Sequence, residues 1–96
     1  MQRHEVLEQL EHHKLLLQEF NVKSLILFGS VARDEATAAS DVDLLVEFNQ
    51  PIGLLAFVRL KRQLEAILGC PVDLGTPNSL KPYLKENVLR ECVRVF

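Results

Sequence analysis

Two aspartates open an otherwise apolar segment at residues 41–48, and a third lies in another apolar segment at Asp73. Burying one unpaired carboxylate is costly, and two neighbouring carboxylates disfavour each other's ionised form. In an extended strand, Asp41 and Asp43 point to the same face, with backbone positions about 6.6 Å apart. Mg²⁺ takes oxygen ligands and keeps water and phosphate in its remaining positions. The spacing therefore predicts a magnesium site.

A simpler interpretation exists for each acidic residue. Asp41 and Asp43 could cap or solvate a turn that follows Ser40. Asp73 could point into water from the edge of a loop. The choice between these interpretations depends on whether the fold brings the acidic residues together.

Hydrophobic periodicity predicts the elements that position these residues. Amphipathic helices are expected over 3–20 and over 54–68, the second ending at Gly69. Short apolar runs predict strands over 24–28, 41–48 and 71–74.

Two further helices are expected from capping residues. Ser30 is expected to cap a helix of about two turns that runs into the small-residue stretch at 37–40. Asn78 or Ser79 is expected to cap a last helix, with Pro82 in its first turn and its end near Cys92. Residues 93–96 are either a tail or an edge strand, and the element order is α-β-α-β-α-β-α.

The connections between the strands predict the topology of the sheet. The link from the first strand to the second is short, which favours antiparallel neighbours, whereas the link to the third contains a helix, as parallel crossovers do. Gly29, Ser30 and Asp73 then lie at the edge where Asp41 and Asp43 begin their strand. Backbone N–H groups at a Gly-Ser turn suit phosphate oxygens. We expect an α/β (α+β) fold with a mixed sheet of about three strands.

Composition limits the classes of function. The 96 residues suffice for one modest core, so we expect residues 1–96 to form a single domain without a separate acceptor-binding domain. A hydrophobic fraction of 48% and a charged fraction of 25% are typical of soluble globular proteins. The net charge of −2 gives no general attraction to long nucleic acids, and no apolar run approaches the roughly 20 residues that cross a membrane.

The cysteine content and the N-terminal residues indicate in which cellular compartment to expect the protein. The polar N-terminus does not resemble a secretory signal, and two cysteines do not suggest a disulfide scaffold. We therefore expect a cytoplasmic protein in which Cys70 and Cys92 act as small buried hydrophobic residues.

Gly29-Ser30, ten intervening residues and Asp41-x-Asp43 resemble the GSx₁₀DxD signature of the polymerase-beta-like nucleotidyltransferases. The short length resembles the minimal nucleotidyltransferases (MNT), the MntA-type antitoxins that are partners of HEPN-domain toxins. The resemblance covers nearly the whole chain and includes the downstream acidic residue Asp73. Members often carry glycine after the arginine of GSxAR, where this chain has Asp34, a change that we expect on a helix surface.

The resemblance implies a set of roles. Asp41 and Asp43 would bind one or two Mg²⁺ ions, Asp73 would complete an acidic triad, and Gly29 with Ser30 would hold the phosphates of the nucleotide. The implied reaction moves AMP from ATP to a tyrosine hydroxyl of a cognate HEPN RNase toxin, with which the chain would form a hetero-oligomer. The alternative is an antitoxin that neutralises its toxin by binding alone.

Several basic residues have two interpretations. Arg33 could pair with the triphosphate or with a surface acid such as Glu35. The exposed basic residues of the helix over 54–68 could pair with Glu65 or form a surface for RNA or a partner; they are Arg59, Lys61 and Arg62.

Overall fold

The structure is a computed structural model that describes residues 1–37 and 41–96, so residues 38–40 of the predicted small-residue stretch lie outside the described residues. Within the described ranges, four strands form one sheet in the order β3-β2-β1-β4. The central pair, β1 (Val22–Phe28) and β2 (Val42–Phe48), is antiparallel. β3 (Val72–Gly75) is parallel to β2, and β4 (Val93–Arg94) is antiparallel to β1. The predicted mixed α/β sheet is confirmed, with an additional edge strand at the C-terminus.

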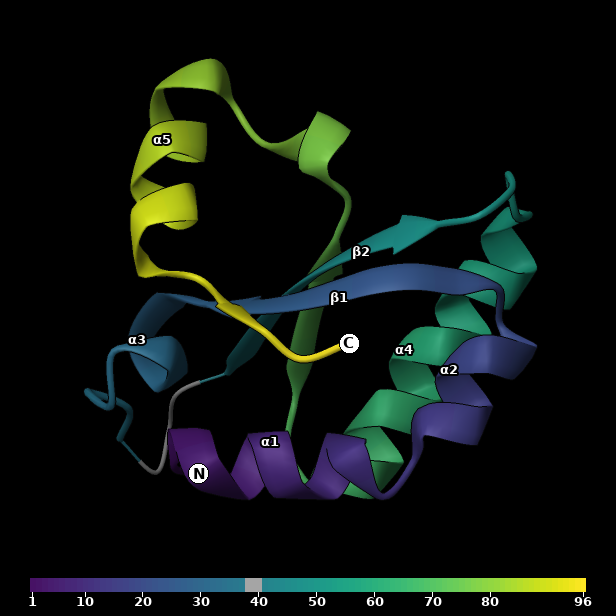
Figure 1. Cartoon of the computed structure of the whole chain (residues 1–96), viewed down its shortest axis with the longest axis horizontal. Helices are drawn as coiled ribbons and strands as arrows, with labels where there is room; N and C mark the ends of the chain where they lie inside the picture. Colours follow the sequence, from purple (N-terminus) through teal and green to yellow (C-terminus); the bar gives the residue numbers. More distant parts are fainter. Residues whose placement is uncertain (38–40) are drawn as a thin grey trace.

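The helices lie on both sides of this sheet. Figure 1 shows α1 (Arg3–Glu11), α2 (Lys14–Glu19) and α4 (Leu54–Leu68) on one side, and α5 (Pro82–Glu91) on the other. The one-turn helix α3 (Gly29–Ala32) directly follows β1 at one end of the sheet. No helix in the described ranges is long and apolar enough to cross a membrane.

The hydrophobic core occupies the face of the sheet that α1, α2 and α4 cover. On this face, β2 buries Val42, Leu44 and Val46 completely. On its other face, Asp43 is half-buried and Glu47 is exposed. This alternation follows from the two-residue period of a strand. The main core therefore uses one face of β2, while the other face carries Asp43 and Glu47 on either side of Leu45, which is 5% exposed.

The predicted helix over 3–20 is divided into α1 and α2 by a break at His12 and His13. His13 has φ −121° and ψ 28°, outside the helical region, and its Nδ1 lies 2.7 Å from the carbonyl oxygen of Gln9. An unbroken 18-residue helix would be about 27 Å long, longer than the seven-residue β1 at about 23 Å. The break lets α1 pack against α4 while α2 packs against β1, so tertiary packing overrides an uninterrupted helical pattern.

The helix over 54–68 and its stop are confirmed: α4 has these bounds, and Gly69 has the left-handed φ of +70° that ends it. The predicted start of the last helix is wrong. A separate 3₁₀ turn, η1 (Pro77–Ser79), comes first, and α5 begins only at Pro82, after the extended Lys81. Residues before a proline are kept out of the helical region, which separates the two elements.

Two expectations about the segment after β1 are also wrong. α3 begins at Gly29 with Phe28 as its N-cap, so Ser30 is a helical residue rather than a cap. The helix ends after one turn because Asp34 adopts a left-handed φ of +58°. Asp34 is therefore not on a helix surface, and glycine would suit its backbone better. Arg3 holds it there, with its backbone N–H 3.2 Å from Oδ1 and its guanidinium 3.2 Å from Oδ2.

Cys70 and Cys92 are free and only partly buried, so the prediction of buried hydrophobic residues overstates their burial. The Sγ atom of Cys70 lies 4.0 Å from the sulfur of Met1, and burial raises the pKa of this thiol. The thiol of Cys92 lies 3.3 Å from the carbonyl oxygen of Leu89.

Candidate active site

The strand register brings two of the three predicted carboxylates together. Asp43 and Asp73 are direct partners across the parallel β2–β3 pair, so they share a face on strands about 4.8 Å apart. Asp41 immediately precedes β2 and is exposed, as is Asp73, whereas Asp43 is half-buried. The three acidic residues thus lie at one end of the sheet, on or beside β2 and β3.

The Gly-Ser turn lies on the other side of Asp43. Phe28, the last residue of β1, is the antiparallel partner of Asp43, and Gly29 follows it with a left-handed φ of +75°. A Cβ atom at Gly29 would overlap Oδ2 of Asp43 and lie 3.1 Å from its Cγ. Glycine is therefore required here by both its backbone conformation and the carboxylate against it.

Asp43 is the most perturbed of the three carboxyl groups. Its pKa is raised above the ordinary value, first because burial disfavours its charged form and then because Asp73 and Asp41 repel that charge. Arg33 acts in the opposite direction and lowers the pKa of Asp43. A half-buried carboxylate whose pKa is raised by burial and by neighbouring charges is common at functional sites.

Arg33 itself is held by two acidic residues. Its Nε donates to Oε2 of Glu35 at 3.0 Å, and its Nη1 donates to Oε2 of Glu91 in α5 at 2.8 Å. Of the two interpretations of Arg33, the structure therefore shows the pairing with a surface acid, Glu35. Glu91 had no signal in the sequence, because it lies 58 residues from Arg33 and only the fold brings them together.

Glu65 does not follow the expectation for the basic residues of α4. Its Oε2 accepts a hydrogen bond of 3.0 Å from the backbone N–H of Val72, at the start of β3. This acidic side chain therefore fastens the strand that carries Asp73.

The donor set fits a hard divalent cation, although the side chains do not form a closed cage. Among residues 1–37 and 41–96, no three His, Cys, Asp or Glu side chains are arranged as a complete metal-binding group. Burial first and then repulsion by Asp73 and Asp41 raise the pKa of Asp43, and a cation at this edge would relieve that repulsion. Mg²⁺ commonly takes one or two carboxylates and obtains its remaining ligands from water and phosphate. Asp43 together with Asp41 or Asp73 would therefore provide enough protein ligands for Mg²⁺.

A small mixed sheet that carries carboxylates beside a glycine-serine turn is the architecture of a nucleotidyltransferase. Comparison with known proteins agrees, and the chain belongs to the nucleotidyltransferase domain family, whose model matches residues 10–95. It is 45% identical over 94 residues to the protein adenylyltransferase MntA of Thermococcus cleftensis, an alignment that covers 93% of this chain and 95% of the relative. The predicted enzyme class, a nucleotidyltransferase, is confirmed.

Solved structures show the same fold. One described as a minimal nucleotidyltransferase has a TM-score of 0.82 and 40% identity, covering 97% of this chain and 95% of its own. The complex of a tri-AMPylated HEPN toxin from Shewanella oneidensis with an MNT antitoxin matches with a TM-score of 0.63 and 23% identity, covering 92% of this chain and 71% of that one. The second likeness concerns the fold alone.

Proposed function

We propose that this chain is a magnesium-dependent protein adenylyltransferase that acts as an antitoxin, moving AMP from ATP to a tyrosine hydroxyl of a HEPN toxin. The observation that carries the proposal is the position of Asp43, half-buried between Gly29 and Asp73 with a pKa above its ordinary value. The name of the Thermococcus relative and the tri-AMPylated toxin in the Shewanella complex support the choice of reaction and partner.

The site residues take separate roles in this proposal. Asp41 and Asp43 hold the metal, Asp73 completes the acidic group, and Gly29 with Ser30 lies against the phosphates of ATP. Bound magnesium would neutralise charge on the triphosphate and on the leaving pyrophosphate. The tyrosine oxygen attacks the α-phosphorus, the bond from that phosphorus to the bridging oxygen breaks, and pyrophosphate leaves. Asp73, an exposed carboxylate on β3 at this edge, accepts the proton of the hydroxyl.

We propose that residues 1–96 form a single minimal nucleotidyltransferase domain and that the partner protein supplies the acceptor, in keeping with the AMPylated toxin of the Shewanella complex. The toxin then contributes both the tyrosine and the surface that positions it, and the two chains form a hetero-oligomer. Long nucleic acids and membranes are not expected partners, and the cytoplasm is the expected location.

Mass spectrometry of the toxin tests the reaction. The toxin is incubated with the chain, ATP and Mg²⁺, and we expect the mass of AMP to be added to a tyrosine. The D41N/D43N double variant should add none, whereas Glu47→Gln, which removes an exposed acid further along β2, should act like the unmodified chain. EDTA should stop the transfer.

A toxin that is neutralised by the D41N/D43N double variant as well as by the unmodified chain, with no added mass, would contradict the enzymatic proposal. That outcome would instead support the alternative, an antitoxin that acts by binding alone. Transfer to serine or threonine would retain the enzyme and reject the tyrosine acceptor.

A further inference from the structure

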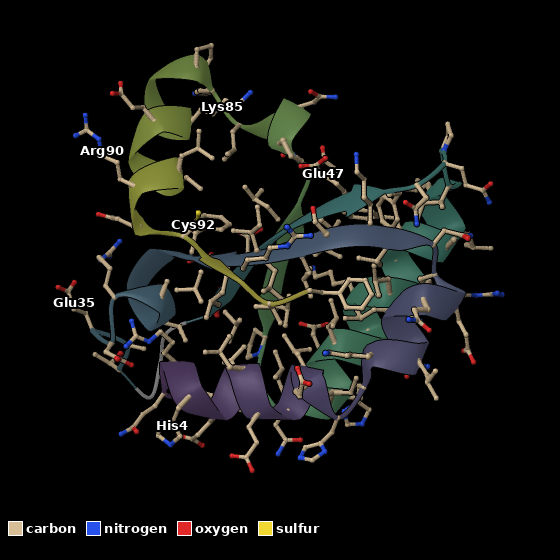
Figure 2. The ribbon with its side chains drawn as sticks, viewed as in Figure 1. His4, Glu35, Glu47, Lys85, Arg90 and Cys92 are labelled. Carbon is tan, nitrogen blue, oxygen red and sulfur yellow. The ribbon has the colours of Figure 1, made fainter. Side chains whose placement is uncertain are left out.

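The first residue of α1 contacts the end of α3 at three points. The backbone N–H of Arg3 donates to Oδ1 of Asp34 at 3.2 Å, and its Nη2 lies 3.2 Å from Oδ2 of the same carboxylate. Its Nη1 donates to the carbonyl oxygen of Ala32 at 3.3 Å. Figure 2 shows the chain neighbours of this pair, His4 on α1 and Glu35 after α3, at the same end of the molecule. The start of α1 is therefore fastened to the segment that follows the Gly-Ser turn.

The backbone after α3 has the hydrogen bonds of a Schellman motif. The N–H of Glu35 donates to the carbonyl oxygen of Ser30 at 2.9 Å, and the N–H of Asp34 donates to that of Val31 at 3.1 Å. This motif requires a left-handed residue at the position that Asp34 occupies, where glycine is usual because it has no Cβ atom. Asp34 meets the requirement with a φ of +58°. The turn is therefore closed by a residue in a conformation that costs free energy.

Arg3 offsets that cost from a rigid support. Its own helix is fixed in the core, where Val6 and Leu10 are 0% and 1% exposed. The carboxylate of Asp34 accepts from the first backbone N–H of α1, a group without a partner in its own helix, and its negative charge suits the positive end of that helix. The guanidinium of Arg3 in turn satisfies the carbonyl oxygen of Ala32, the last residue of α3. Two helix ends thus stabilise each other through one pair of side chains.

A change at Asp34 reaches the candidate active site through Ser30. The carbonyl oxygen of Ser30 is bonded across the turn, and the preceding residue, Gly29, leaves no room for a Cβ atom against Oδ2 of Asp43. With so little clearance, a turn that opens would move Gly29 relative to the carboxylate. The backbone N–H groups that are proposed to meet the triphosphate would move with it. Arg3 can therefore influence nucleotide binding without contacting the nucleotide.

We propose that Arg3 is a positioning residue of the nucleotide site. By holding Asp34 in the left-handed conformation, it keeps the turn closed and the backbone N–H groups of Gly29 and Ser30 oriented toward the triphosphate. This inference rests on the proposed function, which assigns the phosphates to Gly29 and Ser30. The role is conditional, because glycine adopts the left-handed conformation without help. Arg3 should matter to nucleotide binding only while residue 34 is aspartate.

Calorimetric titration of the chain with ATP in the presence of Mg²⁺ tests this condition. Arg3→Gln should weaken ATP binding about three- to tenfold, because only the fraction of molecules with a closed turn binds well. Arg3→Lys should be intermediate, since an ammonium group keeps the charge but not the fork that reaches Ala32 and Asp34 together. Asp34→Gly should bind ATP as the unmodified chain does. Adding Arg3→Gln to Asp34→Gly should then have no further effect.

Lys14→Gln is the matched control. It removes the Lys14–Glu11 pair, in which the charged atoms are 2.9 Å apart at the other end of α1 and the side chains are 49% and 62% exposed. The Arg3–Asp34 pair is similarly exposed, at 45% and 48%. Lys14→Gln should leave the affinity for ATP unchanged. Melting followed by circular dichroism measures the stability of each variant separately, so a loss of affinity is not mistaken for a loss of fold.

The outcomes separate the inference from the proposed function. If Arg3→Gln leaves the affinity for ATP unchanged, whatever its melting temperature, the contacts are only structural and the inference is wrong. An equal loss of affinity in the Asp34→Gly background would also overturn it, because Arg3 would then act by another route. In both cases the proposed function stands. If the unmodified chain does not bind Mg·ATP, both fail together. Should Arg3→Gln not fold, the same comparison is made with Arg3→Lys.

Discussion

Replacement of Gly29 by alanine probes the contact between the Gly-Ser turn and Asp43. The new methyl group would meet two penalties. Gly29 has a left-handed φ of +75°, which an L-residue adopts at a cost of about 1–2 kcal/mol. The Cβ atom would also overlap Oδ2 of Asp43, so the carboxylate must rotate away from its present position.

The size of the second penalty follows from the distances. The Cγ atom of Asp43 would lie 3.1 Å from the new Cβ of residue 29, closer than an ordinary contact. The Cβ atom of Asp43 would lie 3.4 Å from it, which is an ordinary contact distance. Moving only the carboxylate to a less favourable rotamer costs about 0.5–1.5 kcal/mol. We therefore expect Gly29→Ala to lower the free energy of unfolding by about 1.5–3.5 kcal/mol in total.

Gly69→Ala is a matched control for the backbone penalty. Gly69 has a φ of +70°, almost the same as that of Gly29, and nothing lies within 4 Å of the position that its Cβ would occupy. This variant should cost only the left-handed conformation, about 1–2 kcal/mol. The difference between the two variants isolates the contact with Asp43.

Urea denaturation in EDTA measures both variants, and the transfer assay measures their activity. Because Gly29→Ala displaces the carboxylate that is proposed to hold the metal, we expect transfer to fall about 100-fold or more. Gly69→Ala should retain nearly full activity, since its Cβ would have nothing within 4 Å and would leave Asp43 in place.

A double variant decides whether the contact is the cause. In an Asp43→Ala background the overlapping oxygen is absent, so adding Gly29→Ala should cost no more than Gly69→Ala does. Equal destabilisation by Gly29→Ala and Gly69→Ala in the unmodified background would refute the argument. So would a Gly29→Ala protein that transfers AMP at the normal rate.

Other variants test further parts of the structure. Asp43→Asn should abolish transfer yet stabilise the metal-free protein by about 0.5 kcal/mol, a small value because water screens a half-buried carboxylate. Because folding raises the pKa of Asp43, this advantage should be absent below the ordinary value of 3.8 and grow as the pH rises above it, which denaturation at several pH values can check. Asp34→Ala should cost about 1 kcal/mol more than Asp34→Gly in urea denaturation, since both lose the contact with Arg3 but only alanine strains the left-handed backbone. Leu60→Ala should lower the free energy of unfolding by about 2–5 kcal/mol, because this side chain is 0% exposed in the core.

The central strands and α4 were predictable because local and tertiary preferences agree there. The apolar runs before Gly29 and after Asp41 are too short for helices, and the Leu54–Leu68 pattern ends at a glycine that adopts the left-handed conformation. The break at His12 was not predictable in this way. No glycine or proline marks it, and it depends on how far α1 can extend before it overshoots the sheet.

The positions of the acidic residues were predictable from connection lengths alone. A short link and a helical link determine which ends of the strands meet, and this places Asp73 at the edge where Asp41 and Asp43 begin their strand. The direct pairing of Asp43 with Asp73 is seen only in the folded sheet. The conformation of Asp34 and the contact from Glu91 to Arg33 were not predictable either, because both depend on the packing of distant segments. The conformation of Asp34 is imposed by Arg3, 31 residues earlier in the chain. The contact between Arg33 and Glu91 depends on where α5 packs.

The two faces of β2 carry different side chains, and this explains how the domain can hold a carboxylate that is unfavourable in its ionised form. Val42, Leu44 and Val46 bury their side chains completely on the face that the helices α1, α2 and α4 cover. Asp43 lies between them in sequence but on the opposite face, so its charge costs free energy without disturbing the core. A cation that binds only the folded state would recover that cost by mass action. The stability of the fold and the occupancy of the site are therefore linked through one carboxylate.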